Sequence, residues 1–304
     1  MSASASVSVM ILTLNEEKHI GRCIASVRAF AEDVFVVDSY SSDRTAQLAE
    51  SIGAKVYRNT FVNHAAQINW GLDNLPVTTD WIMRLDADEY VTADLSNEIA
   101  SSLGTFPEDV AGLYVPRRVY FMGRWIRHGG YYPTKLLRIW RTGRGRCEQR
   151  WMDEHIYLTG GRSATLRNDI VDDNHNDLTW WTSKHNSYAT REAVELLNAR
   201  YKFFKQSGIS PEYGGSQAQR KRWLKERVYV HLPVGLRASL YFAIRYIFLG
   251  GFLDGYRGFV FHVLQGFWYR FLVDAKIFEI ERKMKLEGLD VKTVLAKYYG
   301  IRVE

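Results

Sequence analysis

Cysteine is scarce in this chain, and the features that mark an exported protein are missing. Among 304 residues only Cys23 and Cys147 are cysteines, far apart and without the spacing of metal ligands. This scarcity argues against a disulfide scaffold and fits a reducing compartment. The apolar run 7–14 is short and follows no basic residues. We therefore expect no signal peptide and a chain that stays in the cytoplasm.

Long hydrophobic runs are also lacking. The most apolar segment, 238–252, is interrupted by Arg245, and the next one, 259–273, contains His262 and Arg270. Neither supplies the roughly 20 uninterrupted apolar residues that cross a bilayer. Because Trp, Tyr and Arg are interspersed with the apolar residues, the pattern predicts amphipathic helices that lie in a membrane interface. An ordinary helical core or a homo-oligomer interface is the alternative.

Glycine-rich phosphate-binding loops are absent. No G-x-G-x-x-G follows the first apolar run, and G-x-x-x-x-G-K-[ST] occurs nowhere in the chain. The usual dinucleotide and P-loop cradles are therefore excluded. A nucleotide site in this chain would need carboxylates for the base and ribose and a metal ion for the diphosphate.

Acidic residues are outnumbered by basic ones, and the formal net charge is +6. This excess predicts an anionic partner, which could be nucleic acid, a phosphate-rich substrate or an anionic membrane surface. The basic and aromatic residues of the last third are spread along apolar helical stretches, without forming a groove-like motif. We therefore expect an anionic membrane surface as a partner, and no nucleic acid.

The first third of the chain alternates short apolar runs with segments of helical periodicity. This order predicts an α/β fold, with a mainly parallel sheet covered by helices on both faces. Two of the strands end in an aspartate, Asp38 or Asp86, and parallel strands bring such ends to one edge. The expected strands are 7–13, 33–38, 54–57 and 79–85, and the expected helices are 19–30, which Asn15 would cap, 44–52 and 63–72.

The fourth expected strand runs directly into the acidic segment Asp86-Ala-Asp88-Glu89. If the chain bends there, the carboxylates of Asp86 and Asp88 can converge on one hard cation. Mg²⁺ and Mn²⁺ favour such oxygen ligands. A solvated turn at a strand end is the alternative interpretation.

Three spaced segments resemble the nucleotide-binding half of the family 2 glycosyltransferases, which have the GT-A fold and invert the anomeric centre. They are VSVMILTLNEEKHI, VVDSYSSDRT and RLDADEY, in that order. The resemblance implies a nucleotide-sugar donor, expected to be a UDP-sugar, and Mg²⁺ or Mn²⁺. Two positions depart from the common pattern: Leu14 stands where many members have Tyr, and Ser39 follows Asp38 where many have a second Asp.

The resemblance also implies roles for residues at the strand ends. Thr13, Asn15 and Glu16 would line the uridine pocket, and Asp38 would accept a hydrogen bond from the base.

Asp86 would hold the ribose or the metal, and Asp88 would bind the metal. Gln67 and Asn69, on the helix before the acidic strand end, would reach the nucleotide or the donor; solvated helix positions are the alternative.

The middle of the chain carries the expected acceptor side. The segment 124–133 combines glycine, arginine, histidine and aromatic residues. Aromatic rings stack on sugar faces, and arginine pairs with phosphate. An inverting transfer needs one carboxylate to deprotonate the acceptor hydroxyl. By resemblance to the family, Glu154 is the expected base and Asp153 the second choice; a structural ion pair with nearby arginines is the alternative.

These features predict a GT-A catalytic domain in 1–177, with a nucleotide-sugar half (1–104) and an acceptor half (105–177). The helical region 178–304 is expected to bind a membrane or to form oligomers. The segments 124–141, 180–193 and 248–259 resemble enzymes of lipopolysaccharide core or lipid-linked saccharide synthesis, which implies a glycolipid or lipid-linked acceptor at the inner face of the cytoplasmic membrane. A sugar-nucleotide nucleotidyltransferase and a non-catalytic membrane-docked scaffold are the alternative functions.

Overall fold

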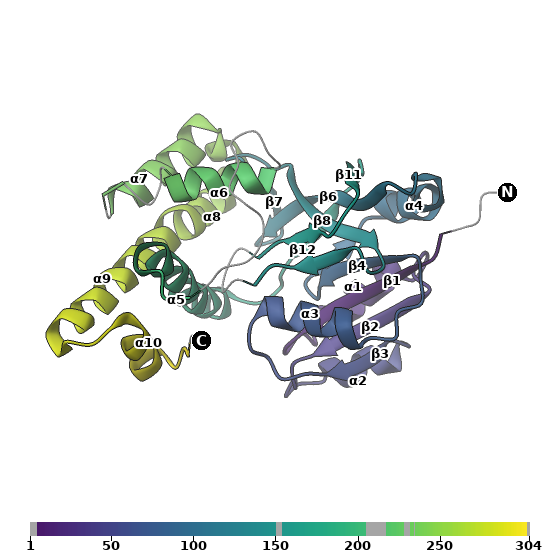
Figure 1. Ribbon diagram of the computed structural model, residues 1–304. Helices are drawn as coiled ribbons and strands as arrows, with labels where there is room; N and C mark the ends of the chain where they lie inside the picture. The colour runs from purple at the N-terminus through teal and green to yellow at the C-terminus, as the bar shows by residue number, and fades with distance from the viewer. Residues whose placement is uncertain (1–4, 150–153, 205–216, 228–231, 234, 303–304) are drawn as a thin grey trace. The chain divides into compact units, whose positions relative to one another are not determined.

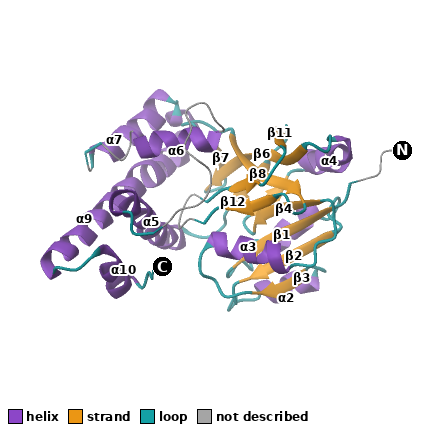
Figure 2. Cartoon of the chain, in the orientation of Figure 1, coloured by secondary structure: helices purple, strands orange, loops and turns teal. Residues whose placement is uncertain are grey.

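The computed structural model describes residues 5–149, 154–204, 217–227, 232–233 and 235–302. The chain divides into two compact units. The first comprises residues 1–148 and 155–175, and the second comprises 149–154 and 176–304. Figure 1 traces the chain through both units, and Figure 2 shows that the described strands belong to the first and that the described part of the second is helical.

The first unit contains an eight-strand path with the order β3-β2-β1-β4-β8-β6-β12-β5, and β7 and β11 pair with β6. The strands β1 to β4 are mutually parallel, as predicted, and β8 begins the mixed half by pairing antiparallel to β4. The strands are β1 (Val7–Thr13), β2 (Asp33–Asp38), β3 (Lys55–Arg58), β4 (Trp81–Asp86), β5 (Glu89–Val91), β6 (Val110–Phe121), β7 (Arg124–Ile126), β8 (Thr134–Arg141), β9 (Gly145–Cys147), β10 (Ile156–Leu158), β11 (Arg162–Thr165) and β12 (Ile170–Asp173).

Helices cover both faces of the parallel strands. The helices of this unit are α1 (Ile20–Val27), α2 (Thr45–Ser51), α3 (His64–Asn74) and α4 (Ala93–Ser102). One core cluster joins α1, α2 and α4 to residues such as Val9 and Ile11 of β1. A second joins α3 to Met10 and Leu12 on the opposite face of the same strand. Because β1 is buried on both faces, it is apolar without alternation, as expected of a central parallel strand.

The second unit is built from α5 (Leu178–Tyr201), α6 (Gln217–Arg227), α7 (Leu236–Ala243), α8 (Gly255–Phe261), α9 (Tyr269–Glu287) and α10 (Val291–Tyr299), with the short helical segments η3 (Ile244–Phe248), η4 (Gly251–Asp254) and η5 (His262–Trp268). Residues of α5, α9 and α10 share a hydrophobic core that includes Ala193, Ile280 and Leu295. In the described part of the chain, no single helix has the length and apolarity of a membrane span. The bent pair Leu236–Phe248 and Gly251–Glu287 meets those criteria together, with a bend of 69°.

Candidate functional site

The register of the parallel strands brings three functional segments to one edge of the sheet. β1 lies between β2 and β4, with Thr13 paired to Asp38 and Leu12 paired to Asp86. The two aspartates therefore flank the carboxyl end of β1, where ligands bind in open α/β sheets. Asp88 follows Asp86 in the turn to β5.

Asp38 is buried, and its carboxylate organises the turn after β2. Oδ1 accepts hydrogen bonds from Thr13 Oγ1 at 2.8 Å and from Ser41 Oγ at 2.5 Å, and Oδ2 accepts one from the backbone N–H of Ser41 at 2.9 Å. A carboxylate has about four acceptor sites. Asp38 thus keeps acceptor capacity for one further donor while it holds the turn in place.

The loop after β1 interlocks with this turn. Asn15 has a left-handed backbone (φ 57°), donates its N–H to Ser41 Oγ at 2.9 Å, and accepts from the backbone N–H of Ser42 at 2.8 Å. The prediction that Asn15 caps the first helix is wrong, because this side chain is bonded across to the second loop. α1 instead has His19 at its N-cap position, without a side-chain cap hydrogen bond.

Glu16 belongs to a second set of contacts between loops. Its N–H donates to Thr45 Oγ1 at 2.7 Å, and its Oε2 lies 2.6 Å from Nδ1 of the buried His19. His19 Nε2 accepts the backbone N–H of His175 at 2.9 Å. With Nε2 accepting this bond, Nδ1 is the ring nitrogen that donates to Glu16. The first loop is thereby tied to the segment that follows β12.

Asp86 sits between two guanidinium groups. Its Oδ1 lies 2.6 Å from Arg84 Nη2, and its Oδ2 lies 3.0 Å from Arg138 Nη2, which also contacts Glu89 Oε1 at 2.5 Å. Burial opposes ionisation of Asp86, but Arg84 and Arg138 outweigh it and hold the pKa of this carboxyl well below its usual value. Asp86 is therefore ionised, with its charge compensated by protein.

The buried Glu89 and the half-buried Asp172 complete an acidic group beside Asp86. Burial raises the pKa of Glu89, against the effect of Arg138. Burial likewise raises the pKa of Asp172 to about 7, although Arg117 lies 3.2 Å away and favours the charged form. The strand end thus concentrates acidic groups that would repel one another without these arginines.

Asp88 is the carboxylate best suited to a metal. It is half-buried, and Oδ2 accepts one hydrogen bond, from Asn174 Nδ2 at 3.0 Å. Among the described residues no Lys, Arg or His forms an ion pair with it. Its backbone carbonyl is held by the N–H of Asp173 at 3.1 Å and by Arg22 Nη2 at 3.3 Å. A positioned carboxylate that no cation of the described residues neutralises fits the oxygen ligand that Mg²⁺ or Mn²⁺ requires.

The described residues include no cluster of three or more His, Cys, Asp or Glu side chains arranged around a common metal position. Mg²⁺ is commonly held by only one or two carboxylates, with substrate phosphates and water completing the shell. The donor set at this edge therefore fits a cation that binds together with a diphosphate.

Gln67 and Asn69 have structural partners. Gln67 is buried and donates to Ser39 Oγ at 3.0 Å and to the carbonyl of Asn59 at 3.2 Å. Asn69 pairs through both ends of its amide with the backbone of Cys147, at 2.9 and 3.0 Å. Gln67 therefore lies beside the Asp38 turn, whereas Asn69 fixes β9.

The two candidates for the base are in a different part of the chain. Glu154 belongs to the second unit, and Asp153 lies outside the described residues. Their role stays a prediction.

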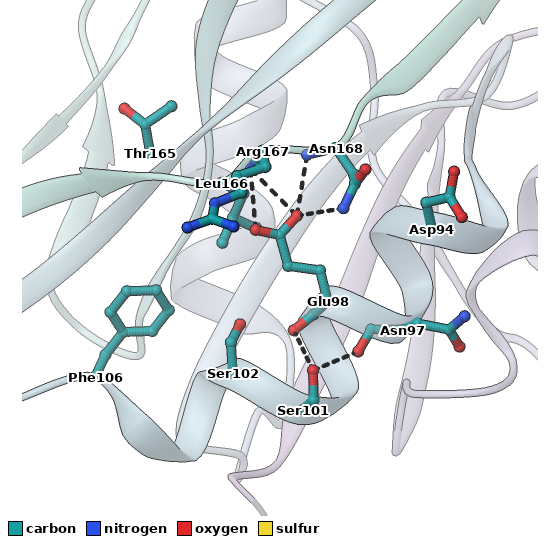
Figure 3. Close-up of a pocket in the computed structure, with 10 residues that line it drawn as sticks. All are labelled: Asp94, Asn97, Glu98, Ser101, Ser102, Phe106, Thr165, Leu166, Arg167 and Asn168. Atoms are coloured by element: carbon teal, nitrogen blue, oxygen red, sulfur yellow. Dashed lines mark hydrogen bonds between the residues drawn. The ribbon is translucent and has the colours of Figure 1, made fainter.

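A hollow of about 600 Å³ lies elsewhere in the first unit, between α4 and the chain before β12 (Figure 3). Its central side chain, Glu98, accepts hydrogen bonds from the backbone N–H groups of Arg167 and Asn168, at 2.9 to 3.2 Å, and from the Asn168 side chain at 2.9 Å. It includes none of the predicted site residues. Because Glu98 already occupies these donors, the hollow is not a ready site for another anion.

Comparison with known proteins identifies the family to which the chain belongs. Residues 8–174, more than half of the chain, match the sequence model of glycosyl transferase family 2. The chain belongs to this family. Its parallel strands and the acidic end of β4 are accordingly those of a family 2 glycosyltransferase with the GT-A fold.

Individual relatives agree with this assignment. An uncharacterized glycosyltransferase from Rickettsia typhi is 25% identical, and the alignment covers 92% of this chain and 89% of the relative. The lipopolysaccharide core biosynthesis glycosyltransferase LpsC from Rhizobium meliloti is 28% identical, over 68% of this chain and 78% of LpsC. Glycosyltransferases of four other Rickettsia species are matched over only 31% to 38% of their own length.

Among solved structures, residues 1–349 of TarS from S. aureus align over 93% of this chain and 92% of that one, with 16% identity and a TM-score of 0.45.

Several residues of the edge were not predicted. Arg84 has a sequence signal, because it lies two positions before Asp86 on a strand and so points to the same face. Arg138 and Asn174 have no such signal. Arg138 lies on β8 and contacts Asp86, 52 residues away in sequence, because β8 pairs with β4. Asn174 follows β12 and contacts Asp88, 86 residues away in sequence.

Proposed function

We propose that this family 2 glycosyltransferase moves a sugar from a UDP-sugar to a glycolipid or lipid-linked saccharide, with inversion and with Mg²⁺ or Mn²⁺. The observation that carries the proposal is the carboxylate edge: Asp38 and Asp86 flank the end of β1, and Asp88 follows in the next turn, where no Lys, Arg or His of the described residues forms an ion pair with its carboxylate. The GT-A fold of family 2 supports a nucleotide-sugar donor, and the sequence has no glycine-rich cradle to replace these carboxylates.

The proposed roles follow the chemistry of each group. Thr13, Asn15 and Glu16 belong to the interlocked loop that would line the uridine pocket, and Asp38 would accept a hydrogen bond from the base. Gln67 supports the turn after Asp38 through Ser39.

Asp88 would bind the cation. Asp86, whose charge Arg84 and Arg138 compensate, suits ribose hydroxyls better than a cation. A bound divalent cation would neutralise charge on the departing nucleoside diphosphate.

The acceptor hydroxyl must lose a proton as it attacks, and one carboxylate suffices for this step. Glu154 is the proposed base, and Asp153 is the second choice. Attack from the face opposite the leaving group would convert an α-linked donor into a β-linked product.

The acceptor side is proposed to include the segment 124–133. The guanidinium carbons of Arg118 and Arg127 lie 4.7 and 4.6 Å from the centre of the Trp125 ring. Arginines and an aromatic face are suited to a phosphorylated saccharide. A lipid-borne acceptor would place the enzyme at the inner face of the cytoplasmic membrane, and the likeness to LpsC favours a role in cell-surface saccharide synthesis.

The test is a transfer assay with radiolabelled UDP-sugars, Mn²⁺ and a bacterial lipid extract. We expect label in the lipid fraction, release of UDP, and loss of both with chelator or in Asp88→Ala. Asp109→Asn, at an exposed ion pair with Arg162, is the matched control and should retain activity. Release of pyrophosphate from a nucleoside triphosphate would instead indicate a nucleotidyltransferase. Absence of any nucleotide-dependent reaction in folded protein would favour a scaffold.

A further inference from the structure

Residues 236–261 form an apolar hairpin in the second unit, in which α7 and η3 are followed, after a turn at Gly250, by η4 and α8. Its large hydrophobic side chains face outward. Ile247, Phe248, Leu249, Phe252, Leu253 and Tyr256 are each at least 50% exposed, and Phe248 and Tyr256 reach 78% and 80%. Isolated exposed hydrophobic residues are ordinary, but a contiguous set marks an interaction surface.

The buried positions of the hairpin region include polar and charged groups as well as Ala238 and Phe261. Asp254 and His262 are 1% and 0% exposed, and Arg237 forms a buried ion pair with Asp274. Glycines allow the close packing: a Cβ on Gly251 would lie 2.6 Å from His262 Nε2. The cluster shared by α5, α9 and α10 in the same unit is apolar, although Glu192, Glu195 and Asn198 of α5 are buried beside it. Polar groups inside and apolar groups outside are the arrangement of helices that face lipid.

Ring contacts make the exposed side chains one continuous surface. Tyr246 of η3 lies 6.4 Å from Phe252 and 5.6 Å from Phe259, between ring centres. Phe242 of α7 lies 6.4 Å from Phe267 of η5. The exposed stripes of these segments therefore adjoin one another.

The charges on this surface have one sign. From residue 235 to 278 the only acidic side chains are Asp254 and Asp274, and both are buried. Arg257 is exposed and Arg245 is half-buried. A second copy docked on the same surface would bring arginines together without an exposed carboxylate to pair with them. Anionic lipid headgroups supply the complementary charge.

The length of the hairpin limits how far it can enter a bilayer. Leu236–Phe248 has 13 residues, or about 20 Å of helix at 1.5 Å per residue. This is shorter than the hydrocarbon core of about 30 Å. The bend of 69° that follows turns the chain sharply, so the second segment does not continue the axis of the first.

We infer that the apolar hairpin inserts into one leaflet of an anionic bilayer, with Phe248, Leu253 and Tyr256 in the hydrocarbon and Arg257 at the phosphates. This inference rests on the proposed function, because an enzyme that uses a lipid-borne acceptor must work at a membrane.

The first test is flotation of the full chain with phosphatidylcholine vesicles, with and without phosphatidylglycerol. The double variant Phe248→Ser/Leu253→Ser should lower the partition coefficient at least about tenfold, because two large side chains lose their burial. Arg257→Gln should lower it about fivefold, on the anionic vesicles only. Leu286→Ser removes an equally exposed leucine at the end of α9 and should change nothing. Equal binding by all variants would overturn the inference.

A second measurement reports the environment of the hairpin itself. Cys23 and Cys147 are buried, so Phe248→Cys can be labelled selectively with an environment-sensitive dye. Its emission should shift to the blue with anionic vesicles, whereas label at Leu286→Cys should not shift. A wild-type dimer that the double variant converts to monomer, without vesicle binding, would assign the surface to a second copy and overturn the inference.

Titration of UDP with Mn²⁺ into the same samples separates this inference from the proposed function. UDP binding without vesicle binding would refute the hairpin inference alone. Vesicle binding without UDP binding would refute the donor site and leave the hairpin supported.

Discussion

Arg138 is expected to be the residue on which the stability of the carboxylate edge depends most. Its side chain is 3% exposed and lies against Glu89, which is 1% exposed, and against Asp86. Arg138→Met leaves a buried carboxylate without its cation. Breaking a buried ion pair on one side costs about 3–5 kcal/mol. For a unit of this size the midpoint of thermal unfolding should fall by about 6–20 °C.

The control variant replaces another arginine by methionine, at an ion pair that is exposed to solvent. Arg44 contacts Glu17 at 3.3 Å but is 73% exposed, so Arg44→Met should cost less than about 1 kcal/mol. Calorimetry on both variants gives the comparison.

The pH dependence adds a second readout for Arg138→Met. Burial raises the pKa of Glu89, and Arg138 opposes that rise. Without Arg138 the pKa should rise further. A carboxyl with a raised pKa in the folded state contributes stability at low pH and loses it as the pH passes through that pKa. The loss of stability caused by Arg138→Met should therefore be larger at pH 8 than at pH 5. A midpoint equal to wild type, or a deficit that grows on acidification, would refute this reasoning.

Three further predictions concern single groups. Asn174→Ala removes the side-chain hydrogen bond to Asp88 and should weaken Mn²⁺-dependent nucleotide binding several-fold, measured by titration, with unchanged binding counting against the contact. Glu154→Gln should abolish sugar transfer but leave nucleotide binding intact; full activity would move the base to Asp153. Asp172 has a pKa raised to about 7, so the stability that it contributes at low pH should be lost as the pH rises through 7. Asp172→Asn should flatten that dependence in unfolding curves between about pH 4 and pH 7, and an unchanged slope would contradict the assignment.

The parallel half of the sheet could be predicted from the sequence because its signals are local. The apolar run 7–13 and the spacing of Ile20, Cys23, Ile24 and Val27 match β1 and the buried face of α1. The aspartates at the ends of β2 and β4 could be placed at one edge because parallel strands share a direction.

What could not be predicted depends on distant pairing. Arg138 reaches Asp86 only because β8 runs antiparallel beside β4. Asn69 suggested a donor contact, but its partner is the backbone of Cys147, which no local pattern discloses. The cap predicted at Asn15 was wrong for the same reason, since its side chain is bonded to Ser42 in another loop.

The donor site can be tested most directly by calorimetric titration of UDP and of GDP into the full chain, with and without Mn²⁺. The account predicts that UDP binds only with Mn²⁺ and that Asp88→Ala, shown to be folded, loses this binding. Absence of binding by either nucleotide to folded wild-type protein, or unchanged binding in Asp88→Ala, would contradict it.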